Sequence, residues 1–298
     1  MQINRISPLY IDYQVKYNSK SFFLDLSDES NKFGINIPMT LESKGGINIL
    51  NYYGKSITIN ANSDHEKNLL TEYILHLNQK YQIQKYNIKY PVICFEENFK
   101  IYSNKLVEEM FIDLSNPEKV IFKNFKQSSK TVLNKIYNEL NYQIIDYLNY
   151  NGEIEEMRKL HIKIANKETR SKETWLINEK MIYNQEGFLI KVDYNNNPIS
   201  YSFFFYNEYL CEYFSSVAIR EYFKKFNNVT HKSIWLAIRY IKKKSEFFYL
   251  GDKTSYSKCE ISEKEKNIEK FKSTFCEFTK KYLLLENLED INYVFKNF

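Results

Sequence analysis

Glycine and proline are both scarce in this sequence of 298 residues, which contains 7 glycines and 5 prolines. Average proteins contain about 7% glycine and about 5% proline, so collagen-like and Gly/Pro-rich disordered chains are excluded. The sequence also lacks the phosphate-binding patterns G-x-G-x-x-G and G-x-x-x-x-G-K-[ST] and the nucleophile pattern G-x-S-x-G. A Rossmann dinucleotide site, a P-loop and an α/β-hydrolase nucleophile are therefore not expected.

Cysteine and histidine are sparse as well, with 4 residues of each. The cysteines form no C-x-x-C pair, so neither a disulfide framework nor a cysteine zinc site is expected, and lone thiols are typical of a reducing compartment. The histidines form no H-x-x-x-H pair, so we expect no metal site. These residues are Cys94, Cys211, Cys259, Cys276, His65, His76, His161 and His231.

Long apolar runs and a strong charge bias are also absent. No stretch approaches the 18 or so apolar residues of a membrane span, and MQINRISPLY lacks the apolar core of a signal peptide, so we expect a cytoplasmic protein. The formal net charge of +5 is too mild for a dedicated nucleic-acid-binding protein, so we expect no DNA partner, but it is compatible with a small anionic ligand.

Hydrophobic and aromatic residues are abundant, at 43% and 17% of the chain. This apolar content is typical of a folded protein, and the length predicts one large domain or two small ones. Strand patterns from Ser21 to Ile59, with a turn at 28–31, precede a helix that Ser63 or Asp64 caps and that ends near Tyr81. Two further strands are expected at Gln84–Lys89 and Val92–Glu96.

The second half repeats this mixture of strands and helices at greater length. We expect helices over 119–140, 153–166, 171–184, 230–244 and 268–275, and strands over 142–149, 187–218, 246–252 and 280–286. The pattern weakens near Lys105, where we place a domain boundary. The sequence therefore predicts an α/β or α+β fold with domains 1–105 and 106–298.

An anion site is predicted where the segment 227–232 leads into the helix SIWLAIRYIKKK. The first turn of a helix offers free N–H groups and partial positive charge, so Asn, Thr and Lys gathered there suit a phosphate. An ordinary N-cap on a surface helix is the alternative. The candidate ligand-binding residues are Asn228, Thr230, His231 and Lys232.

Several other residues are candidates for chemistry. Asp252 follows the apolar strand FFYLG, where a carboxylate at a strand end could accept a proton, although a turn aspartate would look the same. Lys272 lies between two phenylalanines and either points inward or extends to solvent. Arg170 and Trp175 are a loop cation with an aromatic platform, or a helix-start arginine with a core tryptophan.

Taken in order, several stretches resemble the Fem family of peptidoglycan-bridge aminoacyltransferases and related GNAT-type acyltransferases. They are NYYGKSITI, FIDLSNPEKVIFKNFKQSSKTVLNKI, HIKIANKETRSKETW, GFLIKVDYNNNPISYSFFFYNEYLCEYFSSVA, HKSIWLAIRYIKKK, FFYLGD and IEKFKSTF, which resembles the closing Phe-Lys-x-x-Phe signature. The resemblance implies two tandem GNAT-like subdomains with mixed sheets and a cleft between them. It also implies transfer of an acyl or aminoacyl group to an amine of a cell-envelope glycan or peptidoglycan precursor.

The resemblance also implies roles for particular residues. Lys272 matches the family's functional lysine, and with Asp252 it forms the predicted catalytic pair. Lys130 stands where relatives usually have arginine, and Ser245 stands where a glycine often precedes the final strand. The residues implied to bind substrate are Tyr53, Gly54, Lys130, Arg170, Trp175, Tyr213 and Ser215.

No tightly bound cofactor is expected, and two donors compete. The segment NNVTHKS lacks the glycine-rich loop that usually holds the CoA pyrophosphate in GNAT proteins. The leading donor that the resemblance implies is therefore charged tRNA, with acyl-CoA as the alternative. With acyl-CoA, the protein would be an N-acetyltransferase of a nucleotide-linked amino sugar for surface polysaccharide. Peripheral contact with the inner membrane surface is a further expectation for the tRNA-dependent activity. A non-catalytic glycan-binding protein is the reading outside the enzyme class.

Overall fold

The computed structural model describes residues 7–18, 20–35, 37–53, 55–59, 61, 63–91, 106–227, 229–253 and 262–297. Four predicted features lie outside these residues: Gly54, Asn228, the strand at Val92–Glu96 and the domain boundary at Lys105. Among the described residues, no helix combines the length and the apolar character that crossing a membrane requires.

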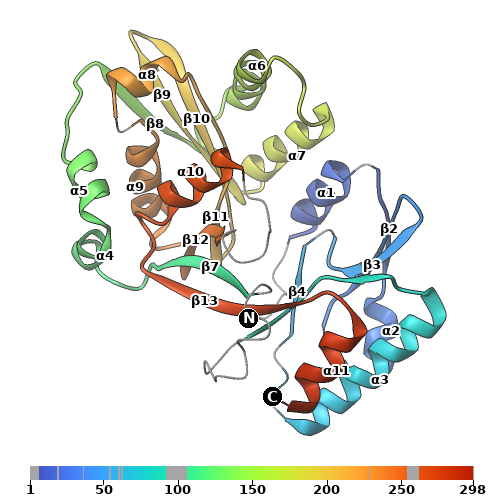
Figure 1. The fold of residues 1–298 in the computed structure, drawn as a ribbon. Coiled ribbons are helices and arrows are strands. Elements are labelled where there is room, and N and C mark those ends of the chain that lie inside the picture. The colour runs from blue at the N-terminus through green and yellow to red at the C-terminus, as the bar shows by residue number, and fades with distance from the viewer. Residues whose placement is uncertain are drawn as a thin grey trace. The chain divides into compact units, whose positions relative to one another are not determined.

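The chain forms two compact units, which Figure 1 shows as two groups of helices and strands. The first unit comprises Met1–Glu108, Thr254–Glu260 and Lys280–Phe298, and the second comprises Glu109–Lys253 and Ile261–Thr279. The contacts assign the last residues of the chain to the first unit. The division into domains 1–105 and 106–298 stays a prediction.

The first unit contains a four-stranded mixed sheet of order β1-β2-β3-β5 and a second set of strands in which β6 pairs with β4 and β13. Its strands are β1 (Phe22–Asp25), β2 (Thr40–Lys44), β3 (Ile47–Asn51), β4 (Ile57–Thr58), β5 (Lys85–Tyr86), β6 (Ile88–Pro91) and most of β13 (Phe278–Leu285). Its helices are α1 (Pro8–Tyr17), α2 (Ser27–Lys32), α3 (Asp64–Tyr81) and α11 (Leu288–Asn297). The turn expected at 28–31 is wrong, because these residues form helix α2.

Helix α3 and the end of the chain build the core of the first unit. Ser63 caps α3 with a reciprocal capping box, in which the Glu66 N–H donates to the Ser63 side chain and the Ser63 N–H donates to the Glu66 carboxylate. Tyr73 and Leu77 of α3 are fully buried in one apolar cluster with Val294 of α11. The predicted cap at Ser63 is confirmed.

The second unit is built on a mixed sheet of order β7-β12-β11-β10-β9-β8, in which β8 to β11 are antiparallel and β12 is parallel to β11. Its strands are β7 (Leu106–Asp113), β8 (Leu140–Ile145), β9 (Gly187–Tyr194), β10 (Asn197–Tyr206), β11 (Leu210–Ala218) and β12 (Phe247–Lys253). Its helices are α4 (Glu118–Asn124), α5 (Gln127–Leu133), α6 (Glu153–Ala165), α7 (Lys172–Tyr183), α8 (Glu221–Lys225), α9 (Val229–Ile241) and α10 (Glu263–Lys272). The predicted mixed α/β fold is confirmed.

Helices cover both faces of this sheet (Figure 1). Phe204 of β10 is buried in one cluster with Ile234 and Ile238 of α9. The preceding residue, Phe203, lies against Gly187 beside Met181 of α7. Because successive side chains of a strand point to opposite faces, α9 and α7 pack on opposite sides of the sheet.

Candidate functional site

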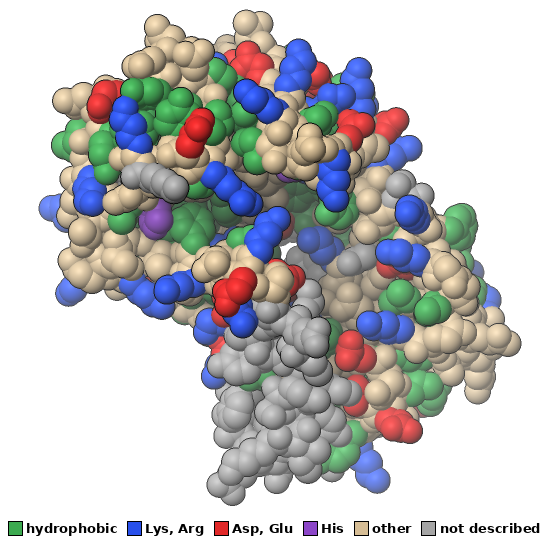
Figure 2. Space-filling view, turned by 45° about the horizontal axis from the view of Figure 1, so that its top comes forward, with side chains coloured by type: hydrophobic (Ala, Val, Ile, Leu, Met, Phe, Trp, Pro, Cys, Tyr) green, Lys and Arg blue, Asp and Glu red, His purple; other side chains and the backbone are tan. Residues whose placement is uncertain are grey.

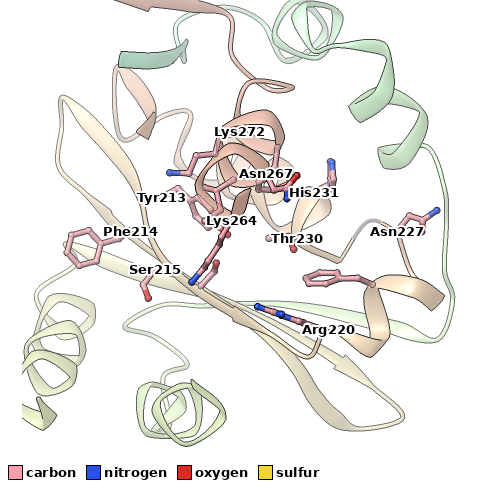
Figure 3. Close-up of a pocket in the computed structure, with 14 residues that line it drawn as sticks. Tyr213, Phe214, Ser215, Arg220, Asn227, Thr230, His231, Lys264, Asn267 and Lys272 are labelled. Atoms are coloured by element: carbon pink, nitrogen blue, oxygen red, sulfur yellow. The ribbon is translucent and has the colours of Figure 1, made fainter. Parts of the chain in front are cut away.

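The parallel strands β11 and β12 run together for only three registered pairs. Leu210 to Glu212 pair with Phe247 to Tyr249, after which β11 continues to Ala218 without further pairing to β12. A cavity of about 830 Å³ lies at this divergence, within the second unit (Figure 3). Ligands of open α/β sheets bind at the carboxyl ends of strands, and this volume falls in the range of small-molecule sites.

Three parts of the second unit line the cavity. Strand β11 contributes four consecutive residues, the segment after it contributes residues up to the first turn of α9, and α10 contributes one face (Figure 3). The lining residues are Tyr213, Phe214, Ser215, Ser216, Arg220, Phe223, Asn227, Thr230, His231, Lys264, Asn267, Ile268, Phe271 and Lys272.

A β-bulge lies in the part of β11 that lines the cavity, where it interrupts the regular alternation of side chains between the two faces of the sheet. The register of β10 with β11 shifts between Phe203 and Phe204, which leaves Phe214 as an extra residue of β11. Such bulges bend the strand and re-aim side chains, and they are frequent beside functional sites.

The cavity carries positive charge. Arg220, Lys264 and Lys272 line it, and none of its described lining residues is Asp or Glu. Figure 2 shows a hollow with hydrophobic side chains at its floor and Lys or Arg side chains on its rim. An apolar floor with a cationic rim suits a ligand that has an apolar or aromatic part and an anionic part.

Lys272 approaches both strands that diverge at the cavity. Its Nζ lies 5.8 Å from the centre of the Tyr213 ring on β11. On β12, a Cβ placed at Gly251 would come within 2.7 Å of the same nitrogen. Lys272 therefore points inward at the end of α10, which is the inward alternative of the two that the sequence left open.

His231 forms part of the cavity wall as a neutral side chain. Its ring lies 4.8 Å from the Phe271 ring and 5.4 Å from the Phe275 ring, measured between centroids. Burial among these groups lowers the pKa of His231 to about 4. At neutral pH this imidazole therefore carries no charge, and the cations of the cavity are lysine and arginine.

Arg170 and Trp175 form the cation and aromatic platform that the sequence suggested. The guanidinium carbon lies 3.6 Å from the centre of the Trp175 ring, and Nη2 donates a hydrogen bond of 3.0 Å to Ser215 Oγ. Trp175 is itself buried, with 2% of its surface exposed. Trp175 is therefore both a core side chain and the aromatic platform on which the Arg170 guanidinium lies.

Two predicted ligand-binding residues point elsewhere. Lys232 follows His231 on α9, but its Nζ lies 4.8 Å from the centre of the Tyr142 ring on β8. Lys130 on α5 donates from Nζ to the backbone oxygen of Lys123, at 2.9 Å. Neither side chain lines the cavity.

Asp252 is exposed on β12, so the strand end does not bury this carboxylate. Gly251, with φ of 109°, interrupts the regular strand conformation just before it. The Oδ1 atom of Asp252 accepts a hydrogen bond of 2.6 Å from the Tyr249 hydroxyl. Burial, with the negative charge of Asp252 next, raises the pKa of Tyr249 well above its ordinary value. Asp252 is not one of the residues that line the cavity.

Tyr53 belongs to the first unit and is described there. It has a φ of 47°, and its hydroxyl donates a hydrogen bond of 3.2 Å to Asp25 Oδ2. Burial, together with the charge of Asp25, raises the pKa of Tyr53 to about 12. Its predicted role in acceptor binding stays a prediction.

The sequence did not single out four polar residues that line the cavity, namely Ser216, Arg220, Lys264 and Asn267. Lys264, Asn267 and Ile268 share one face of α10 with Phe271, and this i, i+3, i+4, i+7 spacing was the available signal. In the part of the chain that the structure describes, no group of three or more His, Cys, Asp or Glu residues could hold a metal ion.

Solved structures provide the comparison for this fold. No protein-family model matches the sequence, and the search of curated proteins found no match. The structure of FemX is similar with a TM-score of 0.54 and 9% identity, over 83% of this chain and 85% of FemX. The structure of L-PGS from Bacillus licheniformis is similar with a TM-score of 0.53 and 10% identity, over 97% of this chain and 96% of that chain.

A third similar structure is a conserved protein of unknown function from Bacteroides thetaiotaomicron, with a TM-score of 0.50 and 11% identity, over 93% of this chain and 88% of that chain. At these identities the likeness establishes the fold. The resemblance to Fem-type proteins that the sequence suggested is therefore confirmed for the fold.

Proposed function

We propose that this protein is an N-acyltransferase, which moves an aminoacyl or acyl group from a phosphate-bearing carrier to an amine. The observation that carries this proposal is the cavity at the divergence of β11 and β12, with three cations and no acidic residue among its described lining residues. It occurs in a fold similar to that of FemX and L-PGS. Fold likeness alone would not assign an activity, so the proposal depends on the chemistry of the cavity.

The donor enters this cavity in our proposal. Charged tRNA and acyl-CoA each carry both an activated carbonyl and phosphate groups, so the cationic rim suits either. The start of α9 has no glycine between Asn227 and Ser233, which disfavours a standard CoA pyrophosphate loop. We therefore favour an aminoacyl-tRNA donor, with acyl-CoA as the alternative.

The acceptor is an amine of a cell-envelope glycan or peptidoglycan precursor. With acyl-CoA as donor, the corresponding acceptor is the amine of a nucleotide-linked amino sugar for surface polysaccharide. In both cases the reacting groups are the same, namely a primary amine and an ester or thioester carbonyl.

The reaction is direct transfer. The amine nitrogen attacks the carbonyl carbon, the new C–N bond forms, and the ester C–O or thioester C–S bond breaks. Negative charge develops on the carbonyl oxygen, and a positioned cation stabilises it in a site with little water. We assign this role to Lys272, because it lines the cavity and its Nζ lies 5.8 Å from the centre of the Tyr213 ring and close to Gly251.

The amine must also lose a proton. Asp252, which follows Gly251 and is hydrogen-bonded to Tyr249, is our candidate acceptor for it. Because this carboxylate is exposed, it would pass the proton directly to solvent.

A comparison of donors tests the proposal. Wild-type protein is first heated with acetyl-CoA, with charged tRNA and with uncharged tRNA, and the shift in melting temperature identifies the donor. Wild-type protein and this donor are then incubated with a panel of amino-sugar nucleotides and peptidoglycan precursors, and products are measured by mass spectrometry. An amide product supports an acyltransferase. Saturable binding of glycans without any amide product would instead identify a non-catalytic glycan-binding protein.

A further inference from the structure

Ser215 lines the cavity and is also hydrogen-bonded to Arg170. The side chain lines the cavity from β11, and its Oγ accepts a hydrogen bond of 3.0 Å from Arg170 Nη2 (Figure 3 labels Ser215). A guanidinium has donors only, so this bond uses a lone pair of the oxygen and leaves the hydroxyl hydrogen for another partner. Among the hydrogen bonds of the described residues, the bond from Arg170 is the only one that involves the Ser215 hydroxyl.

Arg170 is held in place by its surroundings. Its guanidinium lies flat against Trp175, 3.6 Å from the ring centre. Trp175 is buried, and its ring meets the His161 ring edge to face, with centroids 5.6 Å apart. Stacking on a buried aromatic ring fixes the plane of a guanidinium and therefore the direction of its N–H groups.

Arg170 and Lys264 both act electrostatically on His161. Burial lowers the pKa of His161, and the positive charges of Arg170 and of Lys264 lower it further. Figure 3 shows the Lys264 side chain reaching from α10 toward Ser215. A neutral His161 can support Trp175 without adding charge beside Arg170.

We propose that Arg170 is a positioning residue that fixes Ser215 as a hydrogen-bond donor to the carbonyl oxygen of the transferred group. This inference rests on the proposed acyltransferase function and adds a polar contact to it. The charged donor Arg170 polarises the Ser215 hydroxyl, because hydrogen bonds in a chain strengthen one another. Ser215 then donates to an oxygen that becomes more negative as the amine attacks, so the contact is stronger in the transition state than in the ground state.

A double-mutant cycle tests this coupling. The variants are Arg170→Met, Ser215→Ala and the double variant, with transfer rates measured under single-turnover conditions and at saturating donor. Each single change is expected to lower the transfer rate on the order of tenfold to a hundredfold, with little change in donor KM. The double variant is expected to lose no more than the larger single loss, because both changes remove one hydrogen-bonded unit.

Matched variants separate positioning from a structural role. Ser215→Thr keeps the hydroxyl and is expected to retain most of the rate. Arg158→Met removes another half-buried arginine, which lies near Glu155 and Glu168, and is expected to leave the rate unchanged. Melting temperatures of all variants show whether a loss comes from unfolding.

The outcomes are distinguishable. Equal losses in the single and double variants support the inference. Multiplied losses in the double variant, or a rise in donor KM with an unchanged rate, would show that Arg170 acts independently of Ser215 and would overturn the inference alone. A wild-type protein that forms no amide with any donor of the panel would overturn the proposed function and this inference together.

Discussion

Gly251 of β12 makes room for the amine of Lys272. A Cβ at position 251 would lie 2.7 Å from Lys272 Nζ, closer than real Cβ contacts come. Gly251 also has a φ of 109°, a conformation that side-chain-bearing residues rarely adopt. The backbone conformation of β12 and the placement of the Lys272 amine therefore depend on the same residue.

Gly251→Ala should consequently reduce activity more than it reduces stability. The methyl group displaces the Lys272 ammonium, and we expect a loss of transfer rate on the order of tenfold or more, since misplacing a catalytic group by about 1 Å can cost a hundredfold. Gly152→Ala is the matched control, because Gly152 also has a positive φ, of 91°, but has no atom within 4 Å of the added Cβ. Similar rates in the two variants would contradict the prediction.

Lys272→Met should lower the transfer rate on the order of a hundredfold, because it removes the charge that stabilises the oxyanion while keeping most of the length of the side chain. Lys272→Arg should retain part of the rate. Lys270→Met removes an exposed lysine of the same helix that does not line the cavity, and it should behave as wild type. Turnover of Lys272→Met within a factor of about two of wild type would exclude the assigned role.

Asp252→Asn tests the proton acceptor. The change preserves the size of the side chain and leaves an oxygen for the Tyr249 hydroxyl, so we expect a folded protein with activity reduced on the order of a hundredfold. The reduction should be smaller at alkaline pH, where more of the acceptor amine is already unprotonated. If Asp252→Asn matches wild type at neutral pH, the proton leaves directly to water and the carboxylate has no catalytic part.

The stability of the fold should depend on His231 in a defined pH range. Burial lowers the pKa of His231 from 6.5 to about 4, so between these values the unfolded chain binds a proton that the folded protein does not. The contribution of His231 to stability is therefore lost as the pH falls from about 6.5 to about 4.

The His231→Gln variant removes this titration. Its melting temperature should fall less than that of wild type between pH 7 and pH 4.5, as measured by scanning fluorimetry. His65→Gln replaces an exposed histidine and serves as the control, with a pH profile parallel to wild type. A His231→Gln profile that runs parallel to wild type as well would disprove the assignment.

The sequence predicted local features better than those that depend on distant contacts. The capping of α3 by Ser63 and the strand before Gly251 follow from neighbouring residues, and both are present. The pairing of Arg170 with Trp175 is also local, because only four residues separate them. The bond from Arg170 to Ser215 joins residues 45 positions apart, and no local pattern indicates it.

The exposure of Asp252 shows where periodicity fails. The apolar strand before Asp252 predicts burial for residues that continue its alternation, but Gly251 interrupts that alternation at a positive φ. Helix α11 was missed for a different reason. Leu288, Ile291 and Phe295 recur at helical spacing in the sequence. This short pattern does not indicate that the helix packs into the apolar core of the first unit, which begins far away in the chain.

The order of the two units along the chain has a consequence for biosynthesis. Leu283, Leu285 and Ile291, which follow the whole second unit, belong to the core of the first unit. A ribosome therefore releases every residue of the second unit before the first unit can close its core. During that interval the apolar face of α3 lacks the side chains that cover it in the finished fold, so we expect the growing chain to be more prone to aggregation than the finished protein.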